Sequence, residues 1–488
     1  MEDAVLLAFH PLTMLAATLG VCLGIVFGAI PGLSGTLGIA LLLPVTFLIP
    51  ADQSLIMLAG VYAGAVYGGS ISAILLNIPG TSAAVITAME GHVLAREGKA
   101  PRALALATCA SGIGGLVSAI GLLWFSPILA SLALRFGPAE YVMLILFSLA
   151  VVSMMLPTPL FGNFAGAAMG LAIATIGLDP FDGTARFTFG RYELAAGVPL
   201  LPVLIGFFAM PQVLVIALEG FSRAGRSLVE FGRESGLKGI LGTVAGHWAT
   251  FGRASSIGLA LGILPALGPE STPITTHAVE RRFARDKERF GRGSEQGLMA
   301  AECSNNANVG GSLIPLLALG IPGSAAAAVF VGALEIHGLR PGPLLFVENP
   351  TVMTTFFTGF IIVNIVMMAI GLFAARYFAV VLKIPRGIIA TFVAVFAIFG
   401  AYAAGNGMFY VYVLIAATLL ALALRVIDIP ILPVTLGFIL GGLFEQQFAI
   451  MLTSMRSADE FLNRPIALGF LALTIGMIAY VGWRRRWR

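Results

Sequence analysis

Long apolar stretches constrain this chain more than any other feature of its sequence. A helix needs roughly 20 residues to cross a hydrocarbon layer of about 30 Å. Four stretches of about that length carry few or no charges, at residues 103–125, 141–155, 198–218 and 353–375. The chain is 58% hydrophobic and 11% charged, with a mean hydropathy of +0.97, which is far from the composition of a soluble domain. The sequence therefore predicts an all-α polytopic membrane protein.

Glycine and proline are frequent in this chain, with 59 and 26 residues respectively. Membrane helices tolerate both where a neighbouring helix or a cavity satisfies the freed backbone groups. We therefore expect broken or re-entrant helices, and roughly 12 spans in all. No basic region precedes the first apolar run, which starts at Leu12, so we expect that run to be a retained span.

Two motifs occur twice, in the same order, in the two halves of the chain. An isolated Ile-Pro-Gly recurs in many membrane proteins, but two ordered pairs indicate an internal repeat. The pairs are GAIPGLSG at 28–35 with GILPALGP at 262–269, and YGGSISAILLNIPGTSA at 67–83 with VGGSLIPLLALGIPGSAA at 309–326.

The basic loops predict how the two halves are oriented. The loop 281–293 carries six basic residues, whereas its first-half counterpart, 49–53, carries none. The loop 96–102 carries three, and its second-half counterpart has only Arg340. Because basic loops tend to stay in the cytoplasm, equivalent loops are expected on opposite sides of the membrane. The sequence thus predicts two inverted-topology repeats, as in many secondary transporters.

The predicted domains are a first membrane repeat at 1–220, a cytoplasmic linker at 221–239 and a second membrane repeat at 240–488. The second repeat has one extra span, because 387–402 and 408–424 stand where the first has one apolar stretch. We expect a multi-pass protein of a bacterial inner membrane with a periplasmic N-terminus and a cytoplasmic C-terminus. The sequence pI of about 9.1 reflects loops that set topology, so no nucleic acid is expected as a partner.

Proline and glycine mark the expected helix breaks. A proline lacks the amide donor and a glycine relaxes the backbone, so carbonyls and amides are exposed at membrane depth. Half-helix N-termini suit anions, and freed carbonyls suit Na⁺ or a proton-carrying partner. The expected breaks are at Pro31, Gly32, Pro79, Gly80, Pro265, Pro322 and Gly323.

Small polar residues beside these breaks are the candidate binding groups, and we expect them to share one cavity near the bilayer midplane. Small residues also serve helix packing, and Glu302 could equally be an interfacial carboxylate. The expected substrate-binding residues are Asn77, Thr81, Ser82, Asn305, Asn306, Asn308 and Ser324. The expected ion-coupling residues are Ser70, Glu302 and Ser312. No cofactor is expected, and no metal beyond Na⁺, with Na⁺ and H⁺ left open as the coupling ion.

Two other charged positions have a structural and a functional interpretation. Arg253 either begins a helix at the cytoplasmic face, which we favour, or pairs with an anionic substrate. His277, with Glu280, fits a solvated helix end better than a proton relay.

The sequence resembles the large, TctA-type permease subunit of the tripartite tricarboxylate transporters along nearly its whole length. The matching stretches are GAIPGLSG, LLLPVTF at 41–47, YGGSISAILLNIPGT, EGHVLAREGKAPRAL at 90–104, FGRGSEQGLMAAECSNNANVGGSLIP at 290–315 and LALGIPGSAAAAVFVGALEIHGLRPGP at 317–343. Two departures are Pro265-Ala266, where the first half has Pro-Gly, and Glu270, where the family usually has small residues.

The resemblance implies cation-coupled uptake of citrate or another carboxylate. It also implies two partners, a periplasmic solute-binding protein of the TctC type and a small membrane subunit of the TctB type. One alternative is a stand-alone organic anion transporter or exporter. An intramembrane enzyme is disfavoured because HExxH is absent and no catalytic constellation stands at membrane depth, and no GxxxxGK[ST] nucleotide loop occurs.

Overall fold

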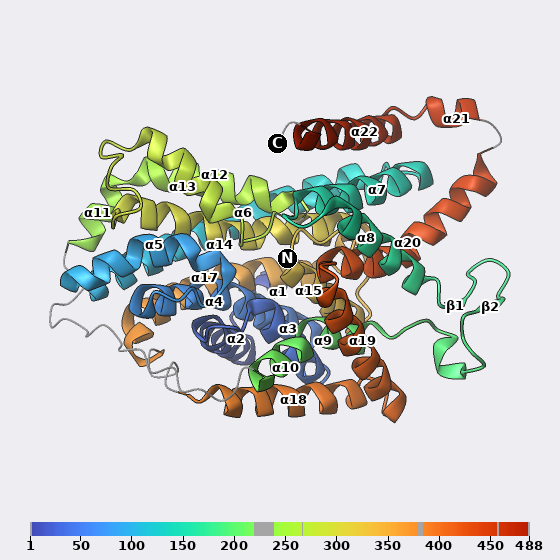
Figure 1. Cartoon of the computed structure of the whole chain (residues 1–488), viewed down its shortest axis with the longest axis horizontal. Coiled ribbons are helices and arrows are strands. Elements are labelled where there is room, and N and C mark those ends of the chain that lie inside the picture. Colours follow the sequence, from blue (N-terminus) through green and yellow to red (C-terminus); the bar gives the residue numbers. More distant parts are fainter. Residues whose placement is uncertain (1, 219–238, 266, 379–383, 456–457, 487–488) are drawn as a thin grey trace. The chain divides into compact units, whose positions relative to one another are not determined.

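The computed structural model describes residues 2–218, 239–265, 267–378, 384–455 and 458–486, and nearly all regular structure in these ranges is helical (Figure 1). The described strands are the two-residue β1 (Gly177–Leu178) and β2 (Ala185–Arg186), which pair antiparallel. The predicted all-α class is confirmed. The predicted linker at 221–239 lies outside the described residues apart from Gly239.

The predicted apolar stretches form helices. They are α6 (Ala100–Ala133), α7 (Pro138–Met155), the consecutive α9 (Leu200–Phe208) and α10 (Met210–Leu218), and α17 (Pro350–Phe378). The stretches behind the predicted extra span form α18 (Arg386–Ala403) and α19 (Met408–Val426). Eight helical segments among the described residues are long and apolar enough to cross a membrane. The protein is therefore a multi-pass membrane protein, while the total of roughly 12 spans stays a prediction.

The chain divides into two compact units, and each unit takes one segment from each half of the sequence. The first contains Met1–Leu129 and Gln212–Phe396, and the second contains Ala130–Pro211 and Ala397–Arg488. The other helical segments of the first unit are α1 (Glu2–Ala8), α2 (Pro11–Ala29), α3 (Gly35–Thr46), α4 (Ala51–Leu76), η1 (Ser82–Ala84), α5 (Val85–Leu94), η2 (Ala95–Lys99), α11 (Ile240–Gly246), α12 (Trp248–Ile263), α13 (Thr272–Phe283), α14 (Glu295–Leu319), α15 (Ala325–Ile336) and α16 (Leu344–Glu348).

Glycines let α2 approach α4 closely in the first unit. A Cβ added at Gly24 would lie 2.4 Å from the carbonyl oxygen of Val61, and one at Gly28 would lie 2.0 Å from that of Ala65. The contact pairs Gly24 with Val61 and Gly28 with Ala65, so residue numbers rise in the same direction along α2 and α4. The two helices therefore run parallel. Small residues at such crossings allow the backbone contact that holds membrane helices together.

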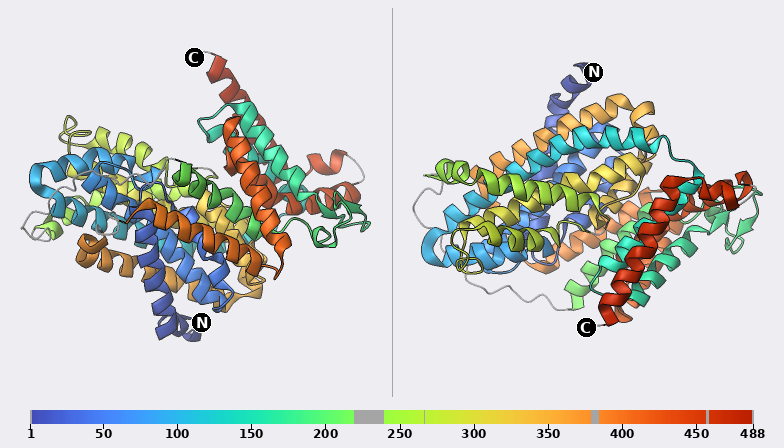
Figure 2. Two further views of the ribbon diagram at one scale, coloured as in Figure 1. Left: turned by 60° about the horizontal axis from the view of Figure 1, so that its bottom comes forward. Right: turned by 90° about the horizontal axis from the view of Figure 1, so that it is seen from above.

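The N-terminal helix α1, dark blue in Figure 2, projects from the other helices of its unit. It is held by α17, where the Thr355 hydroxyl donates a hydrogen bond of 2.9 Å to the carbonyl oxygen of Ala4. Its first turn carries Glu2 and Asp3, which favours the helix because the N-terminal end of the helix dipole is positive.

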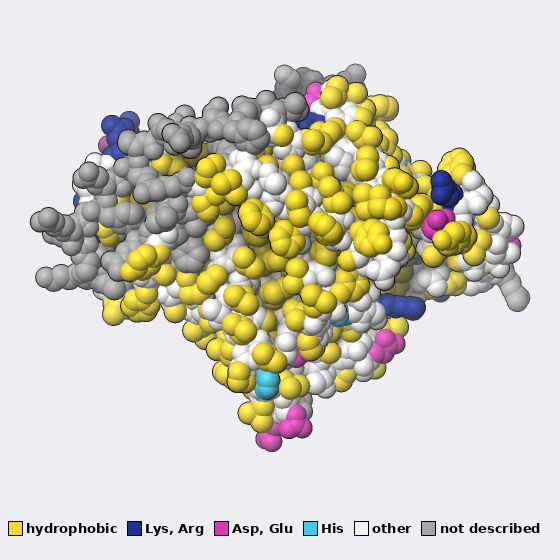
Figure 3. Space-filling model, turned by 90° about the horizontal axis from the view of Figure 1, so that it is seen from below, with side chains coloured by type: hydrophobic (Ala, Val, Ile, Leu, Met, Phe, Trp, Pro, Cys, Tyr) yellow, Lys and Arg dark blue, Asp and Glu magenta, His cyan; other side chains and the backbone are white. Residues whose placement is uncertain are grey.

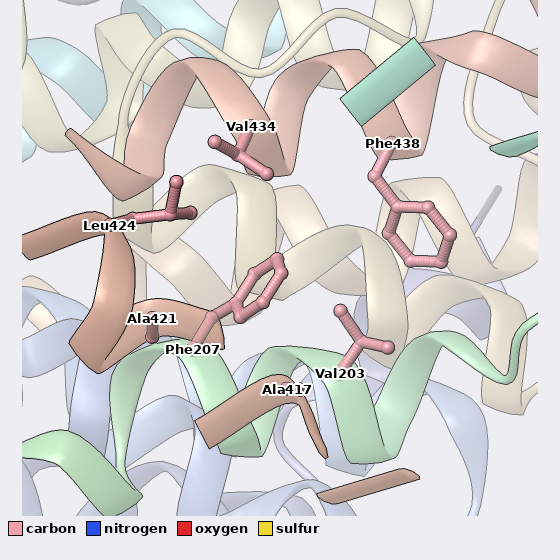
Figure 4. Close-up of a cluster of buried hydrophobic side chains, with 7 residues drawn as sticks. All are labelled: Val203, Phe207, Ala417, Ala421, Leu424, Val434 and Phe438. Carbon is pink, nitrogen blue, oxygen red and sulfur yellow. The ribbon is translucent and has the colours of Figure 1, made fainter. Parts of the chain in front are cut away.

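The second unit packs helices in pairs, α8 (Leu160–Ala174) with α20 (Ile431–Ser454), α7 with α22 (Pro465–Arg486) and α9 with α19. It also contains η3 (Tyr192–Leu194) and α21 (Ala458–Leu462). Figure 4 shows its buried apolar cluster, formed by Val203, Phe207, Ala417, Ala421, Leu424, Val434 and Phe438. Because lipid is as apolar as these side chains, the cluster stabilises the unit through close van der Waals packing rather than through removal of water.

Hydrophobic side chains cover most of the molecular face in Figure 3, and few charged side chains lie among them. Exposed large apolar residues occur in several helices, as at Leu6, Trp124, Phe161 and Phe373. Such a surface is expected where helices face lipid, because lipid removes the cost of exposing apolar groups.

Candidate functional site

The candidate site lies in the first unit, where α4 meets α14. The carbonyl oxygen of Ala63 accepts a hydrogen bond of 3.4 Å from the Nδ2 of Asn306, and Ser70 lies beside Glu302. Residue numbers rise along α4 as they fall along α14, so the helices cross antiparallel. Both helices are almost wholly buried, and polar residues of α14 therefore need partners inside the protein.

Each of these helices ends at a break that folds back on it in the same way. Asn77 caps α4 with φ 54°, and Gly320 caps α14 with φ 76°, both in the left-handed region. The chain then turns back, so that the amide of Gly80 donates to the carbonyl oxygen of Gly69 and that of Gly323 donates to Ser312, each at 3.3 Å. Both turns therefore bring an Ile-Pro-Gly segment back alongside the helix that precedes it.

The glycine of each Ile-Pro-Gly break also contacts the last turn of the helix that precedes the other break of its own half. A Cβ added at Gly80 would lie 2.1 Å from the carbonyl oxygen of Gly28, and one at Gly323 would lie 2.5 Å from that of Gly262. Only glycine allows this approach, since such distances are shorter than any real Cβ contact. All seven residues expected at helix breaks lie outside the helices, between α2 and α3, α4 and η1, α12 and α13, and α14 and α15.

The contacts define which residues of the two halves are equivalent. Aligning the two Gly-Gly-Ser triplets pairs Gly68 with Gly310, but the structure matches Gly68 with Gly311. A Cβ added at Gly68 would lie 2.4 Å from the carbonyl oxygen of Ile25, and one at Gly311 would lie 2.7 Å from that of Leu259. Residues that occupy equivalent places in the two halves are therefore shifted by one position relative to the alignment of the two Gly-Gly-Ser triplets. The inverted repeat and its domain boundaries stay predictions.

Glu302 is fully buried on α14. Its carboxylate accepts hydrogen bonds from the hydroxyl of Thr87 on α5 and, at 2.8 Å, from that of Ser111 on α6. Ser70 interacts with it electrostatically, although the Ser70 hydroxyl makes no hydrogen bond of normal geometry among the described residues. None of the ion pairs within the described ranges involves Glu302. A buried carboxylate with hydroxyl partners and no cation is suited to bind a proton or a small cation.

Two asparagines of α14 make contacts that hold neighbouring segments in place. Asn308 donates two hydrogen bonds of 2.8 Å, to the carbonyl oxygen of Leu267 and to the Thr272 hydroxyl. It thereby anchors the break between α12 and α13. Asn306 binds the backbone of Ala63 on α4, as described above. Both amide groups thus contribute to the packing of the site.

Asn305 differs from its neighbours because neither its Nδ2 nor its Oδ1 has a hydrogen-bond partner among the described residues. The Thr81 hydroxyl, at the first-half break, is buried and unpartnered in the same way. Buried polar atoms without partners are rare and call for a specific explanation, such as a bound water, ion or ligand.

A tyrosine that no motif singled out joins the second-half break to α4. The Tyr62 hydroxyl lies 3.1 Å from Ser312 Oγ and 2.8 Å from Ser324 Oγ. Ser324 also caps α15 by accepting from the amide of Ala327 at 3.1 Å. Glu270 interacts electrostatically with Tyr62, and its own side chain is exposed. The hydroxyls of Ser312 and Ser324 are therefore already engaged.

The structure brings some of the expected residues together and separates others. Ser70, Glu302 and Thr81 gather near Gly69 on α4, and Ser312 and Ser324 gather at Tyr62. Gly69 and Tyr62, where these two groups meet α4, are seven residues apart, or about 10 Å along a helix. Asn77 and Ser82 are exposed beside the first-half break. Whether all these residues share one cavity stays a prediction.

The C-terminal part of α13 lies in a network of ion pairs around two buried carboxylates, Glu90 and Glu280, and not at a solvated helix end. Glu280 is 1% exposed and binds Arg253 through two hydrogen bonds, of 2.6 and 2.9 Å. His277 is also buried, and its Nε2 lies 2.6 Å from the carboxylate of Glu90. The expectation of a solvated end at His277 was wrong, because α5 packs against α13 and covers it. The expectation that Arg253 begins a helix was also wrong, since it lies within α12, where its partly exposed side chain pairs with the buried Glu280.

Sequence reasoning missed Tyr62, Thr87 and Ser111. All three stand in apolar or small-residue stretches without a motif of their own. Their partners are 191 to 262 residues away in sequence, so only the packing of α4, α5 and α6 around α14 identifies them.

A multi-pass helical protein with a buried polar crossing that carries few charges is the kind of structure that membrane permeases have. The model of the tripartite tricarboxylate transporter TctA family matches residues 14–436. The chain belongs to this family, which is a family of transporters and not of enzymes.

Two relatives come from Agrobacterium vitis. One, described as an "uncharacterized 52.8 kDa protein in TAR-I ttuC' 3'region", is 33% identical over 482 residues, which cover 96% of this chain and 93% of the relative. The other, an "uncharacterized protein in TAR-II ttuC' 3'region", is 31% identical over 217 residues, or 44% of this chain and 90% of the relative. No solved structure matches the chain significantly.

Proposed function

We propose that this chain is the large permease subunit of a binding-protein-dependent tripartite transporter, and that it performs cation-coupled uptake of tricarboxylates or related carboxylates. Membership of the TctA family over residues 14–436 is the observation that carries this proposal. The family's tripartite organisation supports dependence on two other subunits, a TctC-like periplasmic solute-binding protein and a TctB-like small membrane subunit.

The geometry of the α4–α14 crossing supports cation coupling. Glu302 is a buried carboxylate without a basic partner among the described residues, so it is a natural place for Na⁺ or H⁺. The two helix breaks fold back onto α4 and α14, and broken helices of this kind line ion sites in secondary transporters. In this proposal the protein sits in a bacterial inner membrane, with its N-terminus in the periplasm and its C-terminus in the cytoplasm.

Reconstituted uptake tests the proposal. Liposomes that contain the chain and the small membrane subunit are supplied with the purified binding protein and labelled citrate, under separately imposed Na⁺ and pH gradients. We expect concentrative uptake only when the binding protein and one of the two gradients are both present. Full uptake by the chain alone would contradict the tripartite proposal and favour a stand-alone anion transporter.

A further inference from the structure

The contacts of the two breaks pair residues of the first half with residues of the second. Gly69 and Ser312 are equivalent, because each accepts the amide of its returning Ile-Pro-Gly glycine. Seven residues before them in sequence come Tyr62 and Asn305. One residue after the two returning glycines come Thr81 and Ser324. By this equivalence, the counterpart of the contact between Tyr62 and Ser324 is a pairing of Asn305 with Thr81.

The two equivalent pairs differ in whether they are satisfied. Tyr62 and Ser324 bond directly, with 2.8 Å between their hydroxyl oxygens. The side-chain amide of Asn305 and the hydroxyl of Thr81 have no hydrogen-bond partner among the described residues. Asn305 is nevertheless 0% exposed, and the Thr81 hydroxyl oxygen is buried. A tyrosine ring carries its hydroxyl much farther from the backbone than an asparagine carries its amide. The side chain of Asn305 is therefore shorter than the tyrosine that bridges to Ser324 at the second-half break, in keeping with the absence of a direct hydrogen bond between Asn305 and Thr81.

Two more polar groups, Ser70 of the first half and Glu302 of the second, belong to the same region. A Cβ added at Gly69 would lie 2.6 Å from the Thr81 hydroxyl oxygen, so Thr81 rests on α4 beside Ser70. The Ser70 hydroxyl is buried beside the Glu302 carboxylate, although it makes no hydrogen bond of normal geometry among the described residues. Glu302 precedes Asn305 by three residues on α14, which places both on neighbouring positions of one helix face. Ser70, Thr81 and Glu302 therefore gather at the first-half break, and the equivalence of the two halves places Asn305 with them.

The chemistry of these groups selects a cation. Ser70, Thr81 and Asn305 offer neutral oxygens, and Glu302 adds a carboxylate that has no ion-pair partner in the described part of the chain. Small hard cations prefer such oxygen ligands, and carbonyls at the end of a broken helix coordinate Na⁺ in transporters.

We propose that Ser70, Thr81 and Asn305, with Glu302 as the counter-charge, form the single site of this chain for a sodium-sized cation, and that the Tyr62 hydroxyl fills the equivalent position in the second half. This deepens the proposed function and rests on its assumption of cation coupling. Ser312 and Ser324, whose hydroxyls bond to Tyr62, are not ion ligands. The Nδ2 of Asn305 remains a donor for a substrate carboxylate, which links the substrate to the cation.

Direct binding of ²²Na⁺ to the purified full-length chain in detergent tests this site. We expect one saturable Na⁺ site per chain. Thr81→Val and Asn305→Leu should each lower the Na⁺ affinity about tenfold or more, the equivalent of at least one lost ligand. Tyr62→Phe is the matched control, because it changes the equivalent contact at the second-half break and keeps the ring in place. It should leave the Na⁺ affinity within about twofold of the wild type. Ser70→Ala, a small change on another helix, repeats the test if the Thr81→Val or Asn305→Leu variant misfolds.

Three results would overturn the proposal. They are two Na⁺ ions per wild-type chain, equal losses in the Tyr62→Phe and Thr81→Val variants, and no Na⁺ binding by a folded wild-type chain. The reconstituted uptake assay separates this failure from failure of the proposed function. If the binding protein drives citrate uptake although no Na⁺ binds, the permease function stands and the site falls. If Na⁺ binds as expected but no carboxylate is transported, the site stands and the substrate assignment falls.

Discussion

Tyr62 on α4 and Ser324 at the start of α15 are joined through their hydroxyl groups at 2.8 Å, although 262 residues separate them in sequence. The same serine hydroxyl accepts from the amide of Ala327 and caps α15. One side chain of the first half of the chain thus fixes the helix break of the second half. Because the contact is fully buried, its loss leaves polar groups that water cannot reach.

Tyr62→Phe should lower the stability of the protein modestly. The ring stays packed, but Ser312 and Ser324 each lose a hydrogen-bond partner, which costs about 0.5–1.5 kcal/mol for buried groups in membrane proteins. Thermal unfolding in detergent measures the change. Tyr412→Phe, at an exposed position on α19, is the control and should unfold like the wild type. Equal unfolding temperatures for all three proteins would show that the Tyr62 contact is not stabilising.

Asn305 and Asn308 should respond in opposite ways to replacement by leucine. Asn308→Leu removes two hydrogen bonds of 2.8 Å and should destabilise the protein by about 1–3 kcal/mol. Asn305→Leu removes an amide that has no partner among the described residues, so it should leave stability unchanged or raise it, while transport is lost. Unfolding temperature and uptake are measured on both variants. A large loss of stability in Asn305→Leu would indicate that this amide has a structural role.

Gly258→Ala should disrupt the crossing of α12 and α14. The added Cβ would lie 2.4 Å from the carbonyl oxygen of Ser304, and the two helices must separate at a cost of about 1–3 kcal/mol. Gly252→Ala on the same helix is the matched control, because a Cβ there meets nothing within 4 Å. That variant should be as stable as the wild type or slightly more stable, since alanine favours helix over glycine. Yield and unfolding temperature of the two purified variants decide the comparison.

Glu90→Gln should loosen the loop that follows α13. The Glu90 carboxylate accepts hydrogen bonds from His277 and from the backbone amides of Gly291, Gly293 and Ser294. The glutamine amide offers one acceptor oxygen in place of two, so some of these hydrogen bonds are lost. The loss should reduce the stability of the loop by about 2 kcal/mol or more. Hydrogen exchange at residues 284–294 should therefore become about 30-fold faster or more, since 1.4 kcal/mol corresponds to a factor of ten.

Glu97→Gln serves as the control for this experiment. Glu97 is exposed and pairs only with the nearby, exposed Lys99 among the described ion pairs. Exchange in the loop should be unchanged in this variant, because exposed ion pairs contribute little to stability. Equal exchange in the Glu90→Gln variant and the wild type would show that the carboxylate does not hold the loop.

Residues 96–102, 223–238, 281–293 and 484–488 should all lie on the cytoplasmic side. The concentration of basic residues in these segments is the reason for the expectation. Single cysteines placed in each segment of a cysteine-free protein should resist an impermeant thiol reagent added from outside, whereas a cysteine at Arg340 should react. Labelling within 281–293 would exclude the inverted topology.

Local chemistry made the helices and their breaks predictable from sequence. Proline next to glycine favours a helix break, so Pro79, Gly80, Pro322 and Gly323 marked the breaks without knowledge of the fold, whereas the isolated Pro44, Pro127 and Pro315 lie inside helices. The apolar stretches likewise predicted α6, α7 and α17, because only length and hydropathy are needed to read a membrane helix. The family could also be recognised, since its motifs are contiguous in the chain.

The sequence by itself determined an all-helical membrane protein with breaks at defined prolines and glycines, and a set of polar residues beside them. Only the tertiary structure decided which of those residues form hydrogen bonds with other parts of the protein. Asn305 and Asn308 look alike in sequence, yet one has no partner among the described residues and the other anchors a break. Tyr62 carries no motif, yet it occupies Ser312 and Ser324. The physical reason is that hydrogen bonding of a buried group depends on what packs against it, and here those partners come from distant parts of the chain.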